Sequence, residues 1–237
     1  GGGDAAALLA RSIAIVGARA CTAYGEHVTG ELAAGVSEAG WTVVSGGAYG
    51  IDATAHRTAL MCDQPTVAFL AGGVDRLYPA GNADLLAGIA EAGVLVAEVP
   101  PGSVPAKARF LQRNRLIAAV SRATVVVEAA WRSGAASTAR HAAELLRPVG
   151  AVPGPVTSAA SAGCHRLIRD GCAVCVTDAA EVLELVGPVP APEPAGPPRP
   201  GDDLPPAVRA TLDALPVRRA ADEESLARAA GLALREV

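Results

Sequence analysis

Short segments that are apolar throughout alternate with helix-like segments along most of this chain. Their residues do not alternate between polar and apolar, so both faces of each strand are expected to be buried. Such strands are typical of a parallel sheet that helices cover on both faces. The sequence therefore predicts an α/β fold, an extended Rossmann-like, doubly wound and mostly parallel sheet. The expected strands cover residues 12–16, 42–44, 65–70, 94–97, 123–128, 149–152 and 173–176.

The distribution of proline divides the 237-residue chain into three parts. Residues 1–186 carry the alternating pattern and are long enough for one Rossmann-like domain with a sizeable core. Residues 187–206 are rich in proline and are expected to form an extended linker. Residues 207–237 contain two short amphipathic patterns, too few for a stable domain alone. This last part resembles the front of a winged-helix module.

The stretch from Trp41 to Leu60 combines a strand, a glycine-rich turn at residues 45–50 and a helix that opens near Asp52. Glycines permit positive φ and let a ligand approach the backbone closely. The free N–H groups of the helix start favour an anion. The turn therefore predicts a phosphate site; alternatively, it is a tight turn in which Asp52 caps the helix. The candidate residues are Ser45, Gly46, Gly47, Tyr49 and Gly50.

The predicted topology brings several loops to the glycine-rich turn. Right-handed crossovers place every strand-to-helix loop at the edge of the sheet where the strands end, here called the carboxyl edge. Arg19 follows the first strand, and Ser133 and Gly134 follow the fifth. We therefore expect a ligand at this edge, in contact with these loops.

A basic segment lies between the fourth and fifth predicted strands. Residues 99–169 contain ten Lys and Arg against two acids, a balance of +8, whereas residues 1–98 have a balance of −6. This contrast predicts a basic face for a polyanion; alternatively, the arginines pair with acids of the first half. The candidate contacts are Lys107, Arg109, Arg113, Asn114 and Arg115, of which at least one arginine is expected to serve structure.

A second turn of small residues opens the helix after the fifth strand. Its backbone N–H groups and hydroxyls are suited to another anion. The candidate residues are Ser133, Gly134, Thr138 and Arg140. The chain has no clear nucleophile–base constellation, and His56 is expected to be a core contact near Asp52. These features favour binding over catalysis, with no catalytic residue and no cofactor.

The cysteines and the apolar runs bear on metal binding and location. Five cysteines without a regular framework fit a reducing compartment. Cys172 and Cys175 could form a zinc site with Cys164 and His165, but two residues three apart on a strand face opposite sides, so no metal is expected. No apolar run is long enough to span a membrane, and no signal peptide is visible. The sequence predicts a cytoplasmic protein with no membrane partner.

Several segments follow one another in a specific order: IVGARACTAYG, VVSGGAYGIDATAHRTAL, GGVDRLYP, F-x-x-R-N-R-x-I, VVVEAAWRSGAASTAR and AVPGPV. Together, over about residues 11–186, they closely resemble the DNA-processing protein A (DprA/Smf) family. The resemblance implies a Rossmann-like domain that binds single-stranded DNA and forms a homodimer. It also implies a role in loading the RecA recombinase onto incoming strands during transformation, and a winged-helix-like C-terminal domain.

One position departs from the family pattern. Many members have arginine in the central turn, S-G-x-A-R-G-I-D, where this chain has Tyr49. Tyrosine can stack on a base but brings no charge. A second hypothesis is a nucleoside monophosphate phosphoribohydrolase-like enzyme on the same fold. Such enzymes carry a P-G-G-x-G-T-x-x-E turn, where this chain reads R-S-G-A-A-S-T-A-R from Arg132 onward.

Overall fold

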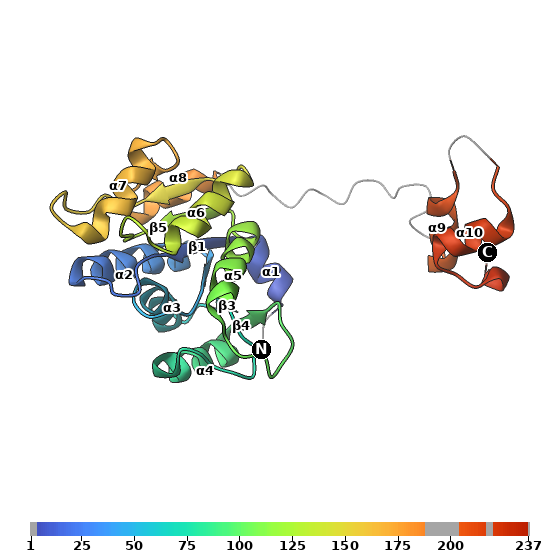
Figure 1. Ribbon diagram of the computed structural model, residues 1–237, viewed down its shortest axis with the longest axis horizontal. Coiled ribbons are helices and arrows are strands. Elements are labelled where there is room, and N and C mark those ends of the chain that lie inside the picture. The colour runs from blue at the N-terminus through green and yellow to red at the C-terminus, as the bar shows by residue number, and fades with distance from the viewer. Residues whose placement is uncertain (1–3, 188–203, 217–219, 237) are drawn as a thin grey trace. The chain divides into compact units, whose positions relative to one another are not determined.

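A computed structural model of the chain describes residues 4–187, 204–216 and 220–236. Its seven parallel strands form one sheet in the order β4-β3-β2-β1-β5-β6-β7 (Figure 1). The chain thus winds outward from the central β1 in both directions, as the sequence predicts. The strands are β1 (Ser12–Val16), β2 (Thr42–Ser45), β3 (Thr66–Leu70), β4 (Val94–Ala97), β5 (Ala123–Val126), β6 (Val149–Ala151) and β7 (Val174–Cys175).

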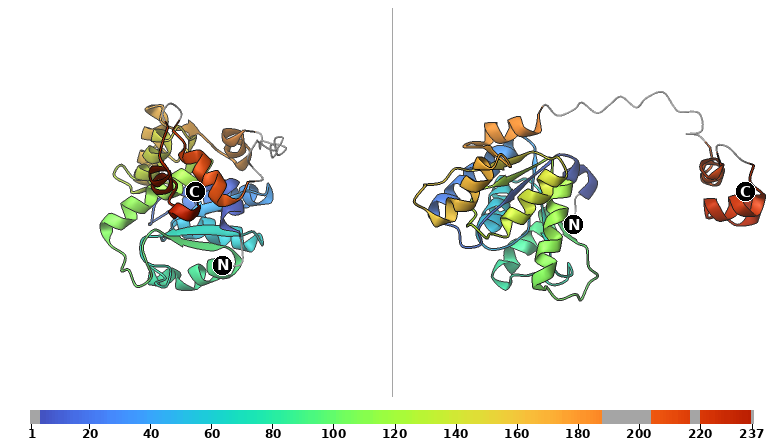
Figure 2. Two further views of the ribbon diagram at one scale, coloured as in Figure 1. Left: turned by 90° about the vertical axis from the view of Figure 1, so that its right-hand side faces the viewer. Right: turned by 45° about the horizontal axis from the view of Figure 1, so that its top comes forward.

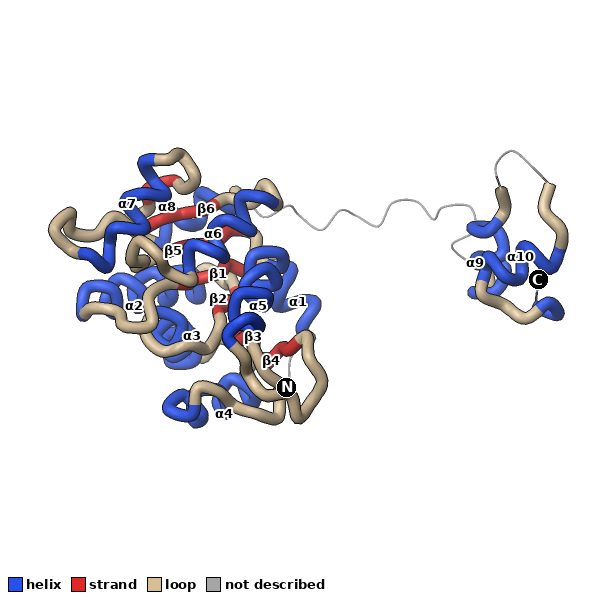
Figure 3. Tube along the Cα trace, in the orientation of Figure 1, coloured by secondary structure: helices blue, strands red, loops and turns tan. Residues whose placement is uncertain are grey.

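Helices cover both faces of this sheet, as the two views of Figure 2 and the strands drawn between helices in Figure 3 show. One face carries α2 (Ala23–Glu38), α3 (Ile51–Met61), α4 (Ala83–Ala92) and α8 (Ala179–Val186). The other carries α1 (Ala5–Ala10), α5 (Lys107–Val120), α6 (Ala135–Glu144) and α7 (Ala162–Arg169). Single 3-10 turns at Ala80–Asn82 and Ala159–Ser161 precede α4 and α7.

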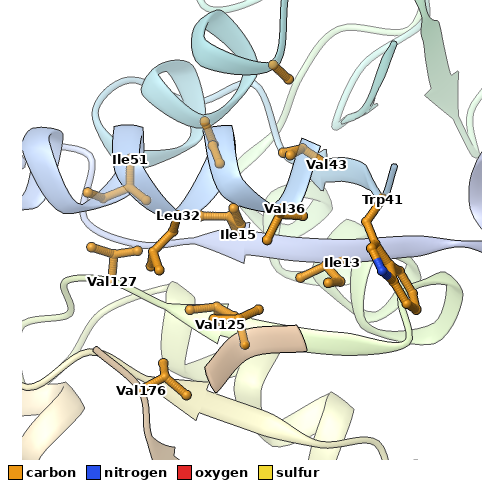
Figure 4. Close-up of a cluster of buried hydrophobic side chains, with 14 of the residues drawn as sticks. Ile13, Ile15, Leu32, Val36, Trp41, Val43, Ile51, Val125, Val127 and Val176 are labelled. Carbon is orange, nitrogen blue, oxygen red and sulfur yellow. The ribbon is translucent and has the colours of Figure 1, made fainter. Parts of the chain in front are cut away.

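The two faces have separate cores because successive side chains of a strand point to opposite sides. In β1, Ile13 and Ile15 pack against α2 and α3, whereas Ala14 and Val16 pack against α5 and α6. Figure 4 shows the first core, with Ile13 and Ile15 facing side chains of α2. Every residue of β1 is buried, which explains the lack of polar alternation in the sequence.

Element boundaries differ from the sequence prediction where a side chain ends or starts an element. Thr22 caps α2, its hydroxyl accepting from the N–H of Gly25, so the helix starts three residues before the expected Glu26. The fifth strand ends at Val126, short of the expected Glu128, whose carboxylate instead accepts from the N–H and hydroxyl of Thr22 at 2.9 and 2.7 Å. The sequence did not predict α1.

The chain divides into two compact units, residues 1–188 and 189–237. The second contains α9 (Pro206–Ala214), α10 (Glu223–Ala230) and a 3-10 turn at Leu234–Glu236. These helices match the two amphipathic patterns. Most of the expected linker, residues 188–203, lies outside the described residues. The winged-helix-like module and the domain boundaries stay predictions.

Candidate nucleic-acid interface

The carboxyl edge of the sheet contains a cavity of about 200 Å³, here called the edge cavity. It lies between the middle of α5, the start of α6, the loop after β1 and the glycine-rich turn. Arginine, amide and hydroxyl side chains from three of these segments line it, together with one aromatic ring. The polar and charged lining residues are Arg19, Asp52, Arg113, Asn114, Ser133 and Thr138, and Phe110 and Gly134 are also part of it.

The glycine-rich turn holds a carboxylate of its own chain. Oδ2 of Asp52 accepts from the N–H groups of Gly46 at 3.2 Å and of Ala48 at 3.4 Å. The Ser45 hydroxyl donates to the carbonyl of Ile15 and is buried. The structure therefore fits the tight-turn interpretation, but the helix cap predicted at Asp52 is wrong, because the N-cap of α3 is Gly50 and Asp52, the second residue of the helix, bonds the turn instead. The Ser45 hydroxyl and the Gly46 N–H, two candidate donors to a phosphate, are thus already bonded within the chain in this conformation.

Arg113 is the buried arginine of the basic segment. Only 6% of the residue is exposed, and its Nη1 donates to the carbonyl of Phe69 at 2.6 Å. This matches the expectation that at least one arginine of the segment serves structure, and it contradicts the expectation that Arg113 is an accessible phosphate contact. Arg115 forms an exposed ion pair with Glu98. The buried Arg113 therefore positions the glycine-rich turn and forms part of the cavity wall.

Burial and charge act in opposite directions on the pair beneath the cavity. Burial raises the pKa of the Asp52 carboxyl, while the Arg113 charge and the N–H groups of the turn oppose this shift. Burial likewise lowers the pKa of Arg113, opposed by the charge of Asp52. Each group therefore depends on the other for its charged form.

Two other cations of the candidate set, Arg19 and Lys107, are exposed, and Arg19 also lines the cavity. Arg19 is exposed, and its guanidinium lies over the ring of Phe110, 5.0 Å from the centroid. Lys107 is exposed at the first residue of α5. Arg109 donates to the carbonyl of Val104 at 2.7 Å, so it holds the loop before α5.

The predicted single basic face is only partly present. Arg140 pairs with Glu144 along α6 at 3.7 Å and does not line the cavity. Arg122 directly precedes β5 and Arg147 lies just before β6, so both lie at the opposite edge of the sheet. The expectation that the +8 excess forms one continuous face is wrong. Basic residues that precede a strand lie at the opposite edge of the sheet from those that follow one, even when they are close in sequence.

The second small-residue turn does contribute to the cavity. The side-chain amide of Asn114 donates to the carbonyl of Gly134 at 3.2 Å and so ties α5 to this turn. The Ser133 hydroxyl accepts from the N–H of Ala135, and Thr138 is buried one turn further along α6. The structure thus brings the Asn114 segment and this turn together, as predicted.

Tyr49 lies at the exposed end of the glycine-rich turn. It is 46% exposed, and its hydroxyl accepts from the N–H of Gly81 at 3.2 Å. Gly50, next to it, has φ +74°, and a Cβ there would lie 2.3 Å from the carbonyl oxygen of Ala18. Gly50 is thus needed for packing against the Arg19 loop. A stacking role for Tyr49 is compatible with its exposure.

Sequence reasoning missed Phe110, which packs between Arg19 and Tyr78. Aromatic residues are only 3% of the chain, so an aromatic inside a basic segment was a usable signal. It also missed Trp131, which is 55% exposed beside the second turn.

The other candidate chemistry is absent from the described part of the chain. His56 is buried, with Nδ1 2.8 Å from the Thr66 hydroxyl. No group of three or more His, Cys, Asp or Glu suited to a metal ion occurs among residues 4–187, 204–216 and 220–236. In those same ranges, no helix is long and apolar enough to cross a membrane.

Comparison with known proteins shows the family to which the chain belongs. The model of the family described as DNA recombination-mediator protein A matches residues 1–187. The chain belongs to the DNA-processing protein A family. It is 57% identical over 226 residues to a putative DNA processing protein DprA of Mycobacterium tuberculosis, covering 94% of this chain and 57% of the relative. It therefore spans somewhat over half of that relative's length.

Two solved structures of the family share the fold. The DNA processing protein A of Streptococcus pneumoniae superposes with a TM-score of 0.70 at 38% identity, covering 75% of this chain and 62% of that one. The Helicobacter pylori protein gives a TM-score of 0.70 at 31% identity, covering 77% and 83%. The latter structure is described as showing a single-stranded DNA binding mode. The Rossmann-like fold predicted from the sequence is thus confirmed.

Proposed function

We propose that this chain binds single-stranded DNA at the carboxyl edge of its sheet, as a DNA-processing protein of the A type. The edge cavity carries the proposal, because it joins guanidinium groups to an aromatic ring at the rim of the sheet. Arg19 over Phe110 supplies charge and a stacking surface together. The described single-strand binding of the Helicobacter pylori relative supports the same ligand.

The shape of the edge favours single strands over duplex. The cavity, at about 200 Å³, has room for one base or one phosphate but not for a double helix. Exposed aromatic residues, Tyr49 and Tyr78, lie near its rim. Bases of a single strand are free to stack on such rings, whereas paired bases are not.

The further parts of this proposal follow the family. The protein is not an enzyme, acts in the cytoplasm, forms a homodimer and helps load RecA onto recombining or incoming strands. The resemblance supports these statements, with no cofactor or metal. Because the chain spans 57% of its Mycobacterium relative, the partners of the whole protein are part of the proposal.

The alternative of a nucleoside monophosphate hydrolase finds less support in the cavity. Among the described residues that line it, Asp52 is the one carboxylate, and the turn already holds it. Glu128, two residues after β5, is buried and bonded to Thr22. Neither carboxylate is free to act as an acid or nucleophile on a sugar.

Titration with labelled oligonucleotides tests the proposal. We expect tighter binding to single-stranded oligo(dT) than to a duplex of equal length, and weaker binding as salt rises. Incubation with nucleoside monophosphates should release no base. Base release, or equal affinity for duplex and single strand, would contradict the proposal.

A further inference from the structure

Trp131 is a large aromatic side chain left open at the carboxyl edge. It is 55% exposed, whereas the other tryptophan of the chain, Trp41, is 5% exposed and part of the core. Ser133 donates its N–H to the carbonyl of Ala130 at 3.0 Å. This turn places Trp131 and Arg132 at the tip of the loop between β5 and α6, directly before the residues that line the edge cavity.

Helix α7 contacts both the loop that carries Trp131 and the Trp131 ring. The N–H of Gly163, at the start of α7, donates to the carbonyl of Ala129 at 2.7 Å. A Cβ at Gly163 would lie 2.6 Å from that same oxygen, so glycine is needed for this close approach. One turn later, the Arg166 guanidinium lies over the Trp131 ring, 4.7 Å from its centroid.

The surroundings of the ring are basic. Arg166 pairs with Asp170 at 3.2 Å, and Arg169 lies 4.0 Å from the same carboxylate. Arg132 is exposed and has no ion pair within the part of the chain that the structure describes. Three arginines thus face one acid around an exposed indole. This charge disfavours a basic or neutral apolar partner and favours a polyanion.

We propose that Trp131, stacked on Arg166, is a second base-stacking site that extends the single-strand track from the edge cavity along the loop after β5 towards α7. This inference rests on the proposed function. One ring face meets Arg166, and the exposed part of the ring can receive a base. Arg132, beside it, is placed to meet the adjoining phosphate. Ser133 and Gly134 connect this site with the cavity.

Length-dependent binding tests the second site. We expect Trp131→Ala to weaken binding of oligo(dT) of about 20 nucleotides by roughly five-fold or more, the loss of one stacked base. Binding of a dinucleotide, which is short enough to occupy the edge cavity alone, should change less than two-fold. Trp131→Phe should largely restore affinity for the longer oligonucleotide.

Tryptophan fluorescence reports direct contact between Trp131 and DNA, which a purely structural role of Trp131 would not produce. Because Trp41 is buried, quenching of tryptophan emission by the longer oligo(dT) should come from Trp131 and disappear in Trp131→Phe. Met61→Ala is the matched control, since Met61 is 77% exposed at the end of α3, at the opposite edge. Thermal unfolding should show that each variant is folded.

The outcomes separate the two proposals. If the chain binds both oligonucleotides but Trp131→Ala leaves both affinities and the quenching unchanged, the second site is refuted and the edge cavity stands. If neither oligonucleotide binds the unaltered chain, the proposed function fails, and the second site with it. Equal loss for both lengths would also contradict a separate site.

Discussion

The guanidinium of Arg113 packs directly on Gly46. A Cβ atom at position 46 would lie 2.0 Å from Nη1 of Arg113, closer than any side chain allows. The backbone N–H of Gly46 donates to the Asp52 carboxylate at 3.2 Å. The glycine-rich turn is therefore compressed between a buried cation and a buried carboxylate, and its glycines serve this packing as well as any ligand.

Gly46→Ala should displace Arg113 and destabilise the protein. Arg113 is buried and bonded to Phe69, so it cannot move aside freely. We expect a loss of roughly 1–3 kcal/mol in the free energy of unfolding, the usual cost of overpacking. Urea denaturation measures this loss. Gly134→Ala is the control, because a Cβ there meets no atom of the described residues within 4 Å. Equal stability of the two variants would contradict the packing argument.

Arg113→Ala should destabilise the protein much more than Arg115→Ala. Removing Arg113 leaves a buried void and takes away the cation that favours the ionised form of Asp52. We expect a loss of roughly 2–5 kcal/mol in unfolding free energy. Removing Arg115 breaks an exposed pair with Glu98 and should cost at most about 1 kcal/mol.

A double variant checks the origin of the Arg113 effect. If Asp52 accounts for part of the loss, Asp52→Asn should cost less in the Arg113→Ala background than alone. Additive losses in urea denaturation would show that the two groups do not interact.

The sequence predicts the sheet well because burial on both faces of a parallel strand leaves a direct mark, as in the wholly apolar β1. It also predicts which loops meet, because parallel strands end at one edge. It did not separate Arg113 from Arg115, since two residues on one helix differ only in the face they take, which depends on packing against Gly46. Nor could it show whether the turn's N–H groups bind Asp52 or a ligand.

Stability should fall in acid through His56. Its Nδ1 lies by the Thr66 hydroxyl, which itself donates to the carbonyl of Val43 at 2.6 Å, so Nδ1 carries the proton. Among the residues that the structure describes, the buried Nε2 has no hydrogen-bond partner. Burial, aided by the charge of Arg113, lowers the pKa of His56 from 6.5 to about 3.

The lowered pKa fixes the sign of this effect. The unfolded chain binds a proton near pH 6.5 and the folded chain does not, so the stability is complete above that pH and is lost as pH falls towards 3. We expect His56 to contribute a loss of roughly 1.4 kcal/mol per pH unit below about pH 6. Urea denaturation across pH should show a shallower decline in His56→Gln. The exposed His27 serves as control, and an unaltered slope in His56→Gln would contradict the assignment.

Tyr49 should contribute stacking and no charge. Tyr49→Ala should weaken single-strand binding by roughly 1–3 kcal/mol, the value of one stacked base. Tyr49→Phe should retain most of the affinity, since it loses only the bond from Gly81. Titration with oligo(dT) measures both, and equal losses in the two variants would show that the hydroxyl, not the ring, matters.

The salt dependence of binding should distinguish Arg19 from Arg140, although the sequence marked both as DNA contacts. Arg19 lies exposed over Phe110 at the cavity, so it is placed to meet a phosphate. Each such contact contributes about −0.7 to the log–log slope of affinity against salt for a single strand. Arg19→Ala should therefore flatten the slope by slightly under one unit. Arg140→Ala should leave it unchanged, because Arg140 pairs with Glu144 along α6, outside the cavity lining. Titrations at several salt concentrations decide between them. Equal flattening in both variants would show that the DNA track also runs along α6, and would contradict the exclusion of Arg140 from DNA contact.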